Sequence, residues 1–127
     1  MFGILLVGLG SCIGGALRYG LSSWTHKVLD SPWFPYGTLT VNVLGCLFIG
    51  FLAGMAETRA AFTPEIRLFI FVGILGGFTT FSSFALETFA LARDTQTVAA
   101  FANIGLQLAL GLGAVWIGNI LSRALGG

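Results

Sequence analysis

The stretch from Gly76 to Phe84 reads Gly-Gly-Phe-Thr-Thr-Phe-Ser-Ser-Phe and interleaves hydroxyl side chains with phenylalanine rings. Glycine weakens a helix and β-branched threonine is stiff within one, so this stretch is a poor helix interior. We expect the helix through it to be broken between Gly76 and Thr79. Broken helices inside membranes recur in ion sites, where a cavity or protein satisfies the freed backbone groups. The alternative is a kinked helix whose threonines bond back to the preceding turn.

Two neighbouring rows of side chains follow the expected break. Phe81 and Phe84 are three residues apart and so share a helix face. Thr80, Ser83 and Glu87 form a polar strip beside the rings by the same spacing rule. A phenyl ring has a positive edge, so an anion can approach the rings edge-on while the hydroxyls donate hydrogen bonds to it. The simpler interpretation is that the rings only pack against other helices.

Neutral amides and a further hydroxyl lie in two other apolar runs. Thr38 and Asn42 are four residues apart in one run, and Asn103 and Gln107 are four apart in another, so each pair shares a helix face. Buried amides often serve only to hold helices together, and this interpretation stays open for Gln107. An anion site built from neutral donors releases its ion more easily than a fixed positive charge does, as conduction requires.

The sequence offers no set of residues for catalysis. Its one histidine, His26, has no partner of the kind that hydrolytic or metal sites use. We therefore expect a protein that is not an enzyme.

The composition places these polar residues inside a membrane. The 127 residues are 56% hydrophobic and only 9% charged, whereas a soluble domain carries about 25% charged residues. The length suits a single domain, residues 1–127. The net charge of +1 and the lack of a basic patch argue against nucleic-acid binding. The uncharged start of the chain indicates a retained membrane helix rather than a cleaved signal peptide.

Four apolar runs are long enough to cross a bilayer as helices, which takes about 20 residues each. Thr63, Pro64 and Glu65 form a helix-start signal for the third run, with a threonine cap followed by proline and an acid. The fold expected is an all-α membrane protein of four transmembrane helices. Their approximate spans are 2–23, 36–57, 65–92 and 96–122.

The charges at the two ends of these spans are nearly balanced. With four spans, both termini and the connection between the second and third spans share one side of the membrane. The positive residues on that side are Arg59, Arg67 and Arg123, and those on the other are Lys27 and Arg93, with Arg18 added if its side chain extends there. Orientation follows an excess of Lys and Arg, and neither side has a clear one. We therefore predict insertion in both orientations and an antiparallel homodimer.

Pairs of glycines four residues apart occur in three of the runs. Such pairs let helix backbones approach closely. The pairs are Gly10 and Gly14, Gly50 and Gly54, and Gly73 and Gly77. They predict helix-packing faces and carry no information about a substrate.

The segment from Gly76 to Phe84, with Glu87 after it, resembles the signature of the Fluc (CrcB-type) fluoride channels. Gly14 and Arg18 in the first run agree with that family, as do Gly37-Thr38-Leu39 and Val41-Asn42 in the second. The resemblance covers the whole chain in length, span count and motif order. It implies a passive channel that exports fluoride from the bacterial cytoplasm across the cell (inner) membrane and confers fluoride resistance. It also implies an antiparallel dual-topology dimer with two pores, each lined by both subunits.

The resemblance also implies roles for particular residues. In the family, phenylalanine ring edges face fluoride, an asparagine and hydroxyls accompany them, and an acid lies toward a pore mouth. The matching positions here are Phe81, Phe84, Asn42, Thr38, Thr80, Ser83 and Glu87. Main-chain carbonyls at the helix break hold a structural sodium ion on the two-fold axis, and they would belong to Gly76 and Thr79. Arg18 matches an arginine with a structural or vestibule role.

The fourth run departs from the family pattern. Many members carry serines there that extend the hydroxyl track, whereas this chain has Asn103 and Gln107 in that region. We expect this helix to contribute either an amide lining in place of hydroxyls or no polar lining at all.

Two other functions remain as alternatives. A small multidrug/proton antiporter also has four spans, but it needs a titratable carboxylate in the membrane, typically in its first helix, and this first run has none. A non-transporting accessory subunit would need no aligned hydroxyl, aromatic and amide faces. Passive fluoride flux without a proton gradient distinguishes the channel from both.

Overall fold

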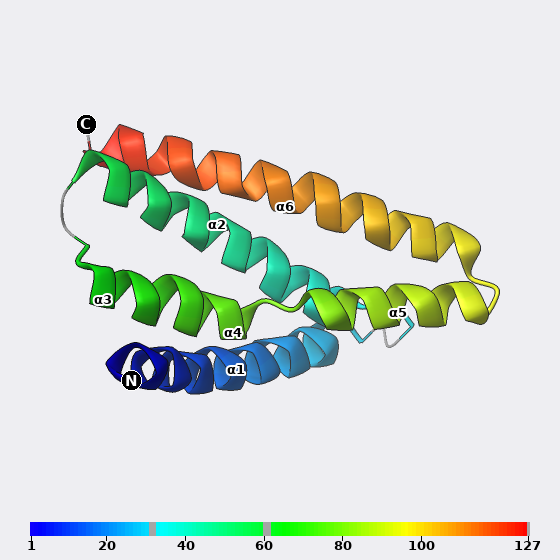
Figure 1. Cartoon of the computed structure of the whole chain (residues 1–127). Coiled ribbons are helices and arrows are strands. Elements are labelled where there is room, and N and C mark those ends of the chain that lie inside the picture. Colours follow the sequence, from blue (N-terminus) through cyan, green and yellow to red (C-terminus); the bar gives the residue numbers. More distant parts are fainter. Residues whose placement is uncertain (31–32, 60–61, 127) are drawn as a thin grey trace.

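The computed structural model describes residues 1–30, 33–59 and 62–126, and throughout these ranges the regular elements are all helices. Four helical segments in the described ranges are long and apolar enough to cross a membrane, which confirms the expected class (Figure 1). They are α1 (Phe2–Leu29), α2 (Tyr36–Thr58), a composite third span (Pro64–Arg93) and α6 (Thr97–Gly126).

The first span extends beyond the Ser23 expected from the sequence, to Leu29. His26 and Lys27 lie in its last turn, where positive side chains suit the negative end of the helix dipole. Asp30 then takes a left-handed conformation (φ 47°) and its N–H donates to His26 O, which ends the helix. Helix end chemistry, rather than loss of apolar character, sets this boundary.

The third span is built from several short helices. α3 (Pro64–Arg67) begins at the predicted cap, where Thr63 Oγ1 accepts a hydrogen bond from Ile66 N (3.3 Å). The π-helix η1 (Leu68–Leu75) follows, and then α4 (Gly76–Phe78). After an interruption the span continues as α5 (Phe81–Arg93).

The interruption falls on Thr79 and Thr80, which are both extended, whereas the two glycines before them remain helical. Thr79 Oγ1 donates a hydrogen bond back to Leu75 O (3.1 Å), as expected for the alternative of a kinked helix. The helix nevertheless ends here, so the span is interrupted and not only kinked. Thr80 then caps α5 by accepting a hydrogen bond from Ser83 N (3.2 Å). The break therefore lies slightly later than the glycine pair suggested.

The spans pack as two pairs, α1 against η1 and α4, and α2 against α6 (Figure 1). A Cβ added at Gly10 or Gly14 would collide with the backbone of η1 or α4, and one at Gly50 with the backbone of Val115 in α6. The predicted glycine faces are thus helix contacts, since only glycine allows backbones this close. Many large apolar side chains remain exposed on the outside of the bundle.

Both termini and the start of α3 lie at one end of the molecule, and the α5–α6 connection lies at the other (Figure 1). Each of the four spans in the described residues therefore runs from one end of the molecule to the other. This arrangement agrees with the sidedness used to compare the charges.

Candidate functional site

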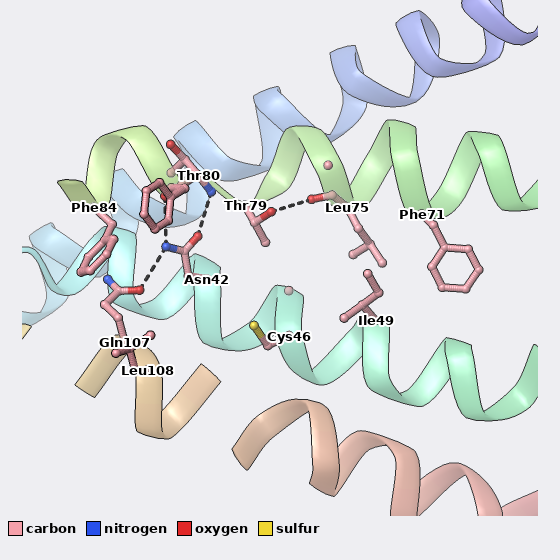
Figure 2. Close-up of a pocket in the computed structure, with 13 residues that line it drawn as sticks. Asn42, Cys46, Ile49, Phe71, Leu75, Thr79, Thr80, Phe84, Gln107 and Leu108 are labelled. Atoms are coloured by element: carbon pink, nitrogen blue, oxygen red, sulfur yellow. Dashed lines mark hydrogen bonds between the residues drawn. The ribbon is translucent and has the colours of Figure 1, made fainter. Parts of the chain in front are cut away.

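The break in the third span is held open by a side chain of α2. Asn42 Oδ1 accepts a hydrogen bond from Thr80 N (2.8 Å), and Asn42 Nδ2 donates to Thr80 O (3.1 Å) (Figure 2). The amide thus pairs with the extended backbone of Thr80 as a neighbouring β-strand would. The backbone N–H of Thr80, which the interrupted helix leaves without a helical partner, is satisfied in this way.

The same amide joins α6 to the break. Asn42 Nδ2 also donates to Gln107 Oε1 (3.1 Å). Asn42 and Gln107 both line a cavity of about 340 Å³, here called the amide cavity. Its lining residues are Asn42, Gly45, Cys46, Ile49, Phe71, Leu75, Gly76, Thr79, Thr80, Phe81, Phe84, Gln107 and Leu108. The wall is mostly apolar, and its polar groups gather at the end where the break lies (Figure 2).

The two phenylalanines of the predicted row line the amide cavity together. The ring centroids of Phe81 and Phe84 are 5.4 Å apart and the ring planes meet at 65°. This edge arrangement directs the positive rim of one ring toward the face of the other and leaves other edges free. Phe84 is half-buried, whereas Phe81 is 77% exposed.

The predicted polar strip faces a second cavity of about 370 Å³, here called the carboxylate cavity. Its lining residues are Gly15, Arg18, Tyr19, Ser22, Ser23, Thr38, Val41, Thr80, Ser83 and Glu87. Thr38 Oγ1 donates to Glu87 Oε1 (2.5 Å). Thr80 Oγ1 donates to Ser83 Oγ (3.0 Å). The hydroxyls of Thr80, Ser83 and Thr38 thus line the same cavity as the Glu87 carboxylate. Thr80 lines both cavities, so they meet at the break.

Arg18 lines the carboxylate cavity and also contacts the backbone near the break. Its Nε donates to Gly77 O (3.0 Å), so the guanidinium points inward from α1 rather than toward a membrane surface. A hydrogen bond from a charged donor is stronger than a neutral one. Arg18 therefore ties α1 to α4 and brings a positive charge to the cavity that holds Glu87.

Asn103, expected to share a lining role with Gln107, is fully buried and is not among the residues lining either cavity. Its Nδ2 donates to Thr88 Oγ1 (2.9 Å), and Thr88 Oγ1 donates to Phe84 O (2.8 Å). This chain of bonds links α6 to α5 directly behind Phe84. Thr88 was not singled out by sequence, because a threonine bonded to its own helix is common and carries no special signal.

The break also releases main-chain carbonyls, and those of Gly76 and Thr79 are among them. In a continuous helix, Gly76 O and Thr79 O would accept from the N–H groups of Thr80 and Ser83, four residues later. Those N–H groups donate instead to Asn42 Oδ1 and Thr80 Oγ1. Carbonyls of an unwound helix segment are the ligands that sodium takes in membrane transporters. The two residues expected to hold sodium thus have the donor chemistry that the ion requires.

Several residues of the amide cavity carry no signal in the sequence. Cys46, Ile49 and Leu108 are ordinary apolar positions of α2 and α6, and only the packing of the spans brings them to this cavity. Gly45 could have been noticed as a glycine without a partner four residues away. A Cβ there would collide with the Thr79 side chain, so glycine at this position allows the broken segment to approach α2.

Comparison with known proteins identifies the family. Residues 5–119 match the family described as "CrcB-like protein, Camphor Resistance (CrcB)". A protein of Methylobacillus flagellatus named fluoride-specific ion channel FluC is 42% identical over 118 residues, which is 93% of this chain and 92% of that protein. Proteins with the same name are 43% identical over 122 residues in Rhizobium meliloti, covering 96% of this chain and 97% of that one, and 42% identical over all 127 residues in Chloroflexus aurantiacus, covering both chains fully. These matches confirm the resemblance drawn from the motif of the third span, and this chain belongs to the CrcB family.

Proposed function

We propose that this protein is a passive fluoride channel that lets fluoride leave the bacterial cytoplasm through the inner membrane and so lowers its toxicity. The observation that carries the proposal is the amide cavity, where two phenylalanine edges and an amide pair meet at the broken helix. The relatives named fluoride-specific ion channels support the same function. A channel is not an enzyme.

Fluoride is a small anion that holds its water strongly, so a pore must replace that water with closely spaced donors. Hydroxyl, amide and ring-edge groups do this without a fixed charge in the lining of the amide cavity, and an ion bound this way can leave again. In the amide cavity these groups come from Thr80, Phe81, Phe84 and Gln107. The carboxylate cavity, with Arg18 and Ser83, continues from Thr80 and provides an approach to the break.

The functional unit in this proposal is an antiparallel homodimer in the membrane, with two pores that each use both subunits. Phe81 supports it, because a large ring that is 77% exposed at the site itself needs a neighbour to complete the cavity. The distribution of positive charge between the two ends of the molecule also supports the antiparallel dimer. The elements α2, α3 and α6 carry Arg59, Arg67 and Arg123 at one end of the molecule, and α1 and α5 carry Lys27 and Arg93 in their last turns at the other, a balance that favours both orientations.

Sodium is part of this proposal as a structural ion on the two-fold axis. The carbonyls of Gly76 and Thr79, released by the break, would hold it together with those of a second subunit. A bound cation would fix the two broken segments against each other and add positive potential near the pores.

The test is fluoride efflux from liposomes that contain the purified protein, with a potassium ionophore to clamp the voltage and chloride efflux measured in parallel. We expect rapid fluoride release, little chloride release and no requirement for a proton gradient. Release no faster than from empty liposomes, by protein shown to be folded, would contradict the channel. Fluoride movement that depends on a proton gradient would favour an antiporter instead.

A further inference from the structure

The carbonyls just before the helix break need partners other than their usual helical ones. In a continuous helix, the carbonyls of residues 76–79 would accept from the N–H groups of residues 80–83, which lie beyond the break. Thr80 N donates instead to Asn42 Oδ1, and Ser83 N donates to Thr80 Oγ1. Each released carbonyl therefore requires another donor or a cation.

One of these carbonyls, Gly77 O, is bonded to the first helix. Arg18 Nε of α1 donates to it (3.0 Å). Gly14 lies one turn before Arg18 on the same face of α1, and a Cβ there would collide with Ile74 O and Phe78 N. The hydrogen bond and the close packing together fix how α4 is rotated against α1, which lies beside it (Figure 1).

This rotation directs the two glycines of α4 to different surroundings. A Cβ added at Gly77 would collide with the backbone of Ser11 in α1, whereas one at Gly76 would meet only Phe71 O of its own span, at 3.7 Å. Successive helix residues point about 100° apart, so holding Gly77 against α1 turns Gly76 away from it. Gly76 lines the amide cavity instead.

We propose that Arg18 is a positioning residue for the sodium ion, because by holding Gly77 O against α1 it directs the carbonyls of Gly76 and Thr79 toward the partner subunit. This inference rests on the proposed dimer with sodium on its two-fold axis. Arg18 itself does not touch the ion, since its guanidinium is bonded to Gly77 O and lines the carboxylate cavity. Groups that orient the ligands of a metal ion contribute to its affinity in this way.

Two properties of arginine suit this role. Its guanidinium is always charged, so its bond to a carbonyl is stronger than a bond from a neutral donor. It also carries donors only, so it cannot replace a carbonyl as a ligand of sodium. Arg18 therefore removes Gly77 O from the carbonyls open to a cation without adding a ligand of its own.

The charge of Arg18 alone would have the opposite effect on sodium. Like charges repel, so a guanidinium near a cation site weakens cation binding unless it also arranges the ligands. If repulsion were its main effect, neutralising Arg18 would strengthen sodium binding. The direction of the change in sodium affinity therefore distinguishes positioning from repulsion.

The test compares Arg18→Gln with Arg18→Met by thermal unfolding of the purified dimer over a series of sodium concentrations. A large organic cation keeps the ionic strength constant. Both variants remove the charge. Glutamine places an N–H donor the same number of bonds from the backbone as Arg18 Nε, whereas methionine places a methyl group there. The difference between the two variants therefore reports the hydrogen bond alone.

Sodium that binds only the folded dimer raises the unfolding temperature once its concentration exceeds its Kd. We expect the onset of this rise to move to about tenfold higher sodium in Arg18→Met, as for the loss of one hydrogen bond from a charged donor. In Arg18→Gln the onset should stay within about threefold of the wild-type value. A purely structural role would instead lower the unfolding temperature equally at every sodium concentration.

Ser11→Ala is the matched control. Ser11 Oγ also donates from α1 to the third span, to Gly73 O (3.4 Å). Gly73 belongs to η1, before the break, and its carbonyl is not one of the two expected to hold sodium. Ser11→Ala should therefore lower the unfolding temperature slightly, for the lost bond, and keep the wild-type sodium onset.

Two results would overturn the positioning role of Arg18. One is an onset in Arg18→Met that is unchanged or lies at lower sodium than in the wild type. The other is an equal rise of the onset in Arg18→Gln and Arg18→Met, because the retained N–H donor would then make no difference. If Arg18→Met does not form a folded dimer, Arg18→Gln decides: an onset near the wild-type value supports the role, and a tenfold rise overturns it.

Failure of the proposed function gives different results. A wild-type unfolding temperature that does not depend on sodium would refute the sodium site itself, and this inference with it. A normal sodium response in a wild-type protein that releases no fluoride from liposomes would refute the channel and leave the role of Arg18 standing.

Discussion

Phe81 and Phe84 belong to the same row of residues but differ in what surrounds them. Phe84 is half-buried, and Thr88, which donates to its backbone carbonyl, is held in turn by Asn103. Phe81 is 77% exposed and has Phe84 as its aromatic neighbour at 5.4 Å. Phe84 is thus fixed by contacts within this chain, whereas Phe81 is left open at the surface, where the proposed dimer would place a second subunit.

Replacing either ring with isoleucine tests the role of the ring edges. Isoleucine keeps an apolar side chain but has no positive rim. We expect Phe81→Ile and Phe84→Ile each to lower fluoride efflux about threefold to tenfold, in line with the strength of aromatic edge interactions. The dimer should persist in both variants.

Phe89→Ile is the control for these substitutions, because Phe89 is an exposed phenylalanine of the same helix that lines neither cavity. It should conduct normally. Wild-type efflux in both Phe81→Ile and Phe84→Ile would refute the role of the ring edges.

For individual residues, the sequence predicted contacts between side chains of the same helix better than contacts between side chains of different helices. The spacing of Thr80 and Ser83 was enough to place their hydroxyls together, and they are bonded at 3.0 Å. The bonds of Asn42 to Thr80 and to Gln107 depend on how far α2 lies from two other helices. No local pattern encodes that distance, so the direction of the Gln107 amide was beyond sequence reasoning.

The third span combines an irregular helix with a true interruption. Its first half is the π-helix η1, and π segments are frequent at functional sites because they shift the register of side chains and backbone groups. After Thr79 and Thr80 the chain restarts as α5 with its own threonine cap. The element thus supplies released carbonyls before the restart and aligned rings after it.

Close contact between α1 and the third span holds the broken element in place, and Gly14 tests this. A Cβ at Gly14 would collide with the carbonyl of Ile74 and the backbone nitrogen of Phe78. We expect Gly14→Ala to destabilise the protein by about 1–3 kcal/mol, as overpacking does. Thermal unfolding in detergent measures the change.

The adjacent Gly15 provides the control, since a Cβ there meets nothing within 4 Å. Gly15→Ala should leave the stability unchanged or raise it slightly, because alanine is a better helix former than glycine by about 1 kcal/mol. Equal stability in the two alanine variants would contradict the close packing of α1 on η1 and α4.

Sequence reasoning located the spans but not their internal structure. Runs without charge predicted four apolar helices, and Thr63 marked the start of the third one correctly. The prediction ended the first span where the apolar run ends, whereas α1 continues to Leu29. The added turns contain polar residues, and the positive Lys27 in the last turn suits the negative end of the helix dipole. The π-helix was missed too, because its residues form an ordinary apolar run that carries no local signal for π geometry.

The charges of the whole molecule predict how it inserts, and shifting them should change its activity. Lysines added at the end that holds both termini (Glu65→Lys with Leu125→Lys) should fix one orientation, and lysines at the opposite end (Asp94→Lys with Gln96→Lys) the other. If the functional unit is antiparallel, each variant alone should confer little fluoride resistance on cells lacking their own exporter.

Producing both variants in the same cells should restore resistance, since the two orientations can then pair. Cysteine labelling from either side of the membrane reports the orientation of each variant. Full resistance from one variant alone, in a single orientation, would contradict the antiparallel dimer.

Sodium removal tests the ion proposed for the centre of the dimer. A ligand that binds only the folded dimer stabilises it as its concentration rises. Long exchange of sodium for a large organic cation should therefore lower the thermal unfolding temperature, and returning sodium should restore it. An unfolding temperature that is independent of sodium, at constant ionic strength, would count against an ion on Gly76 and Thr79.

The most direct test of the account is the zero-current voltage of the protein in a planar bilayer, with fluoride and chloride gradients set in opposite directions. A passive, selective fluoride pore predicts a steady current that vanishes at the equilibrium potential of fluoride and is unchanged by a proton gradient. A zero-current voltage at the equilibrium potential of chloride, or a flux that follows the proton gradient, would contradict the claim that this molecule is a passive fluoride channel.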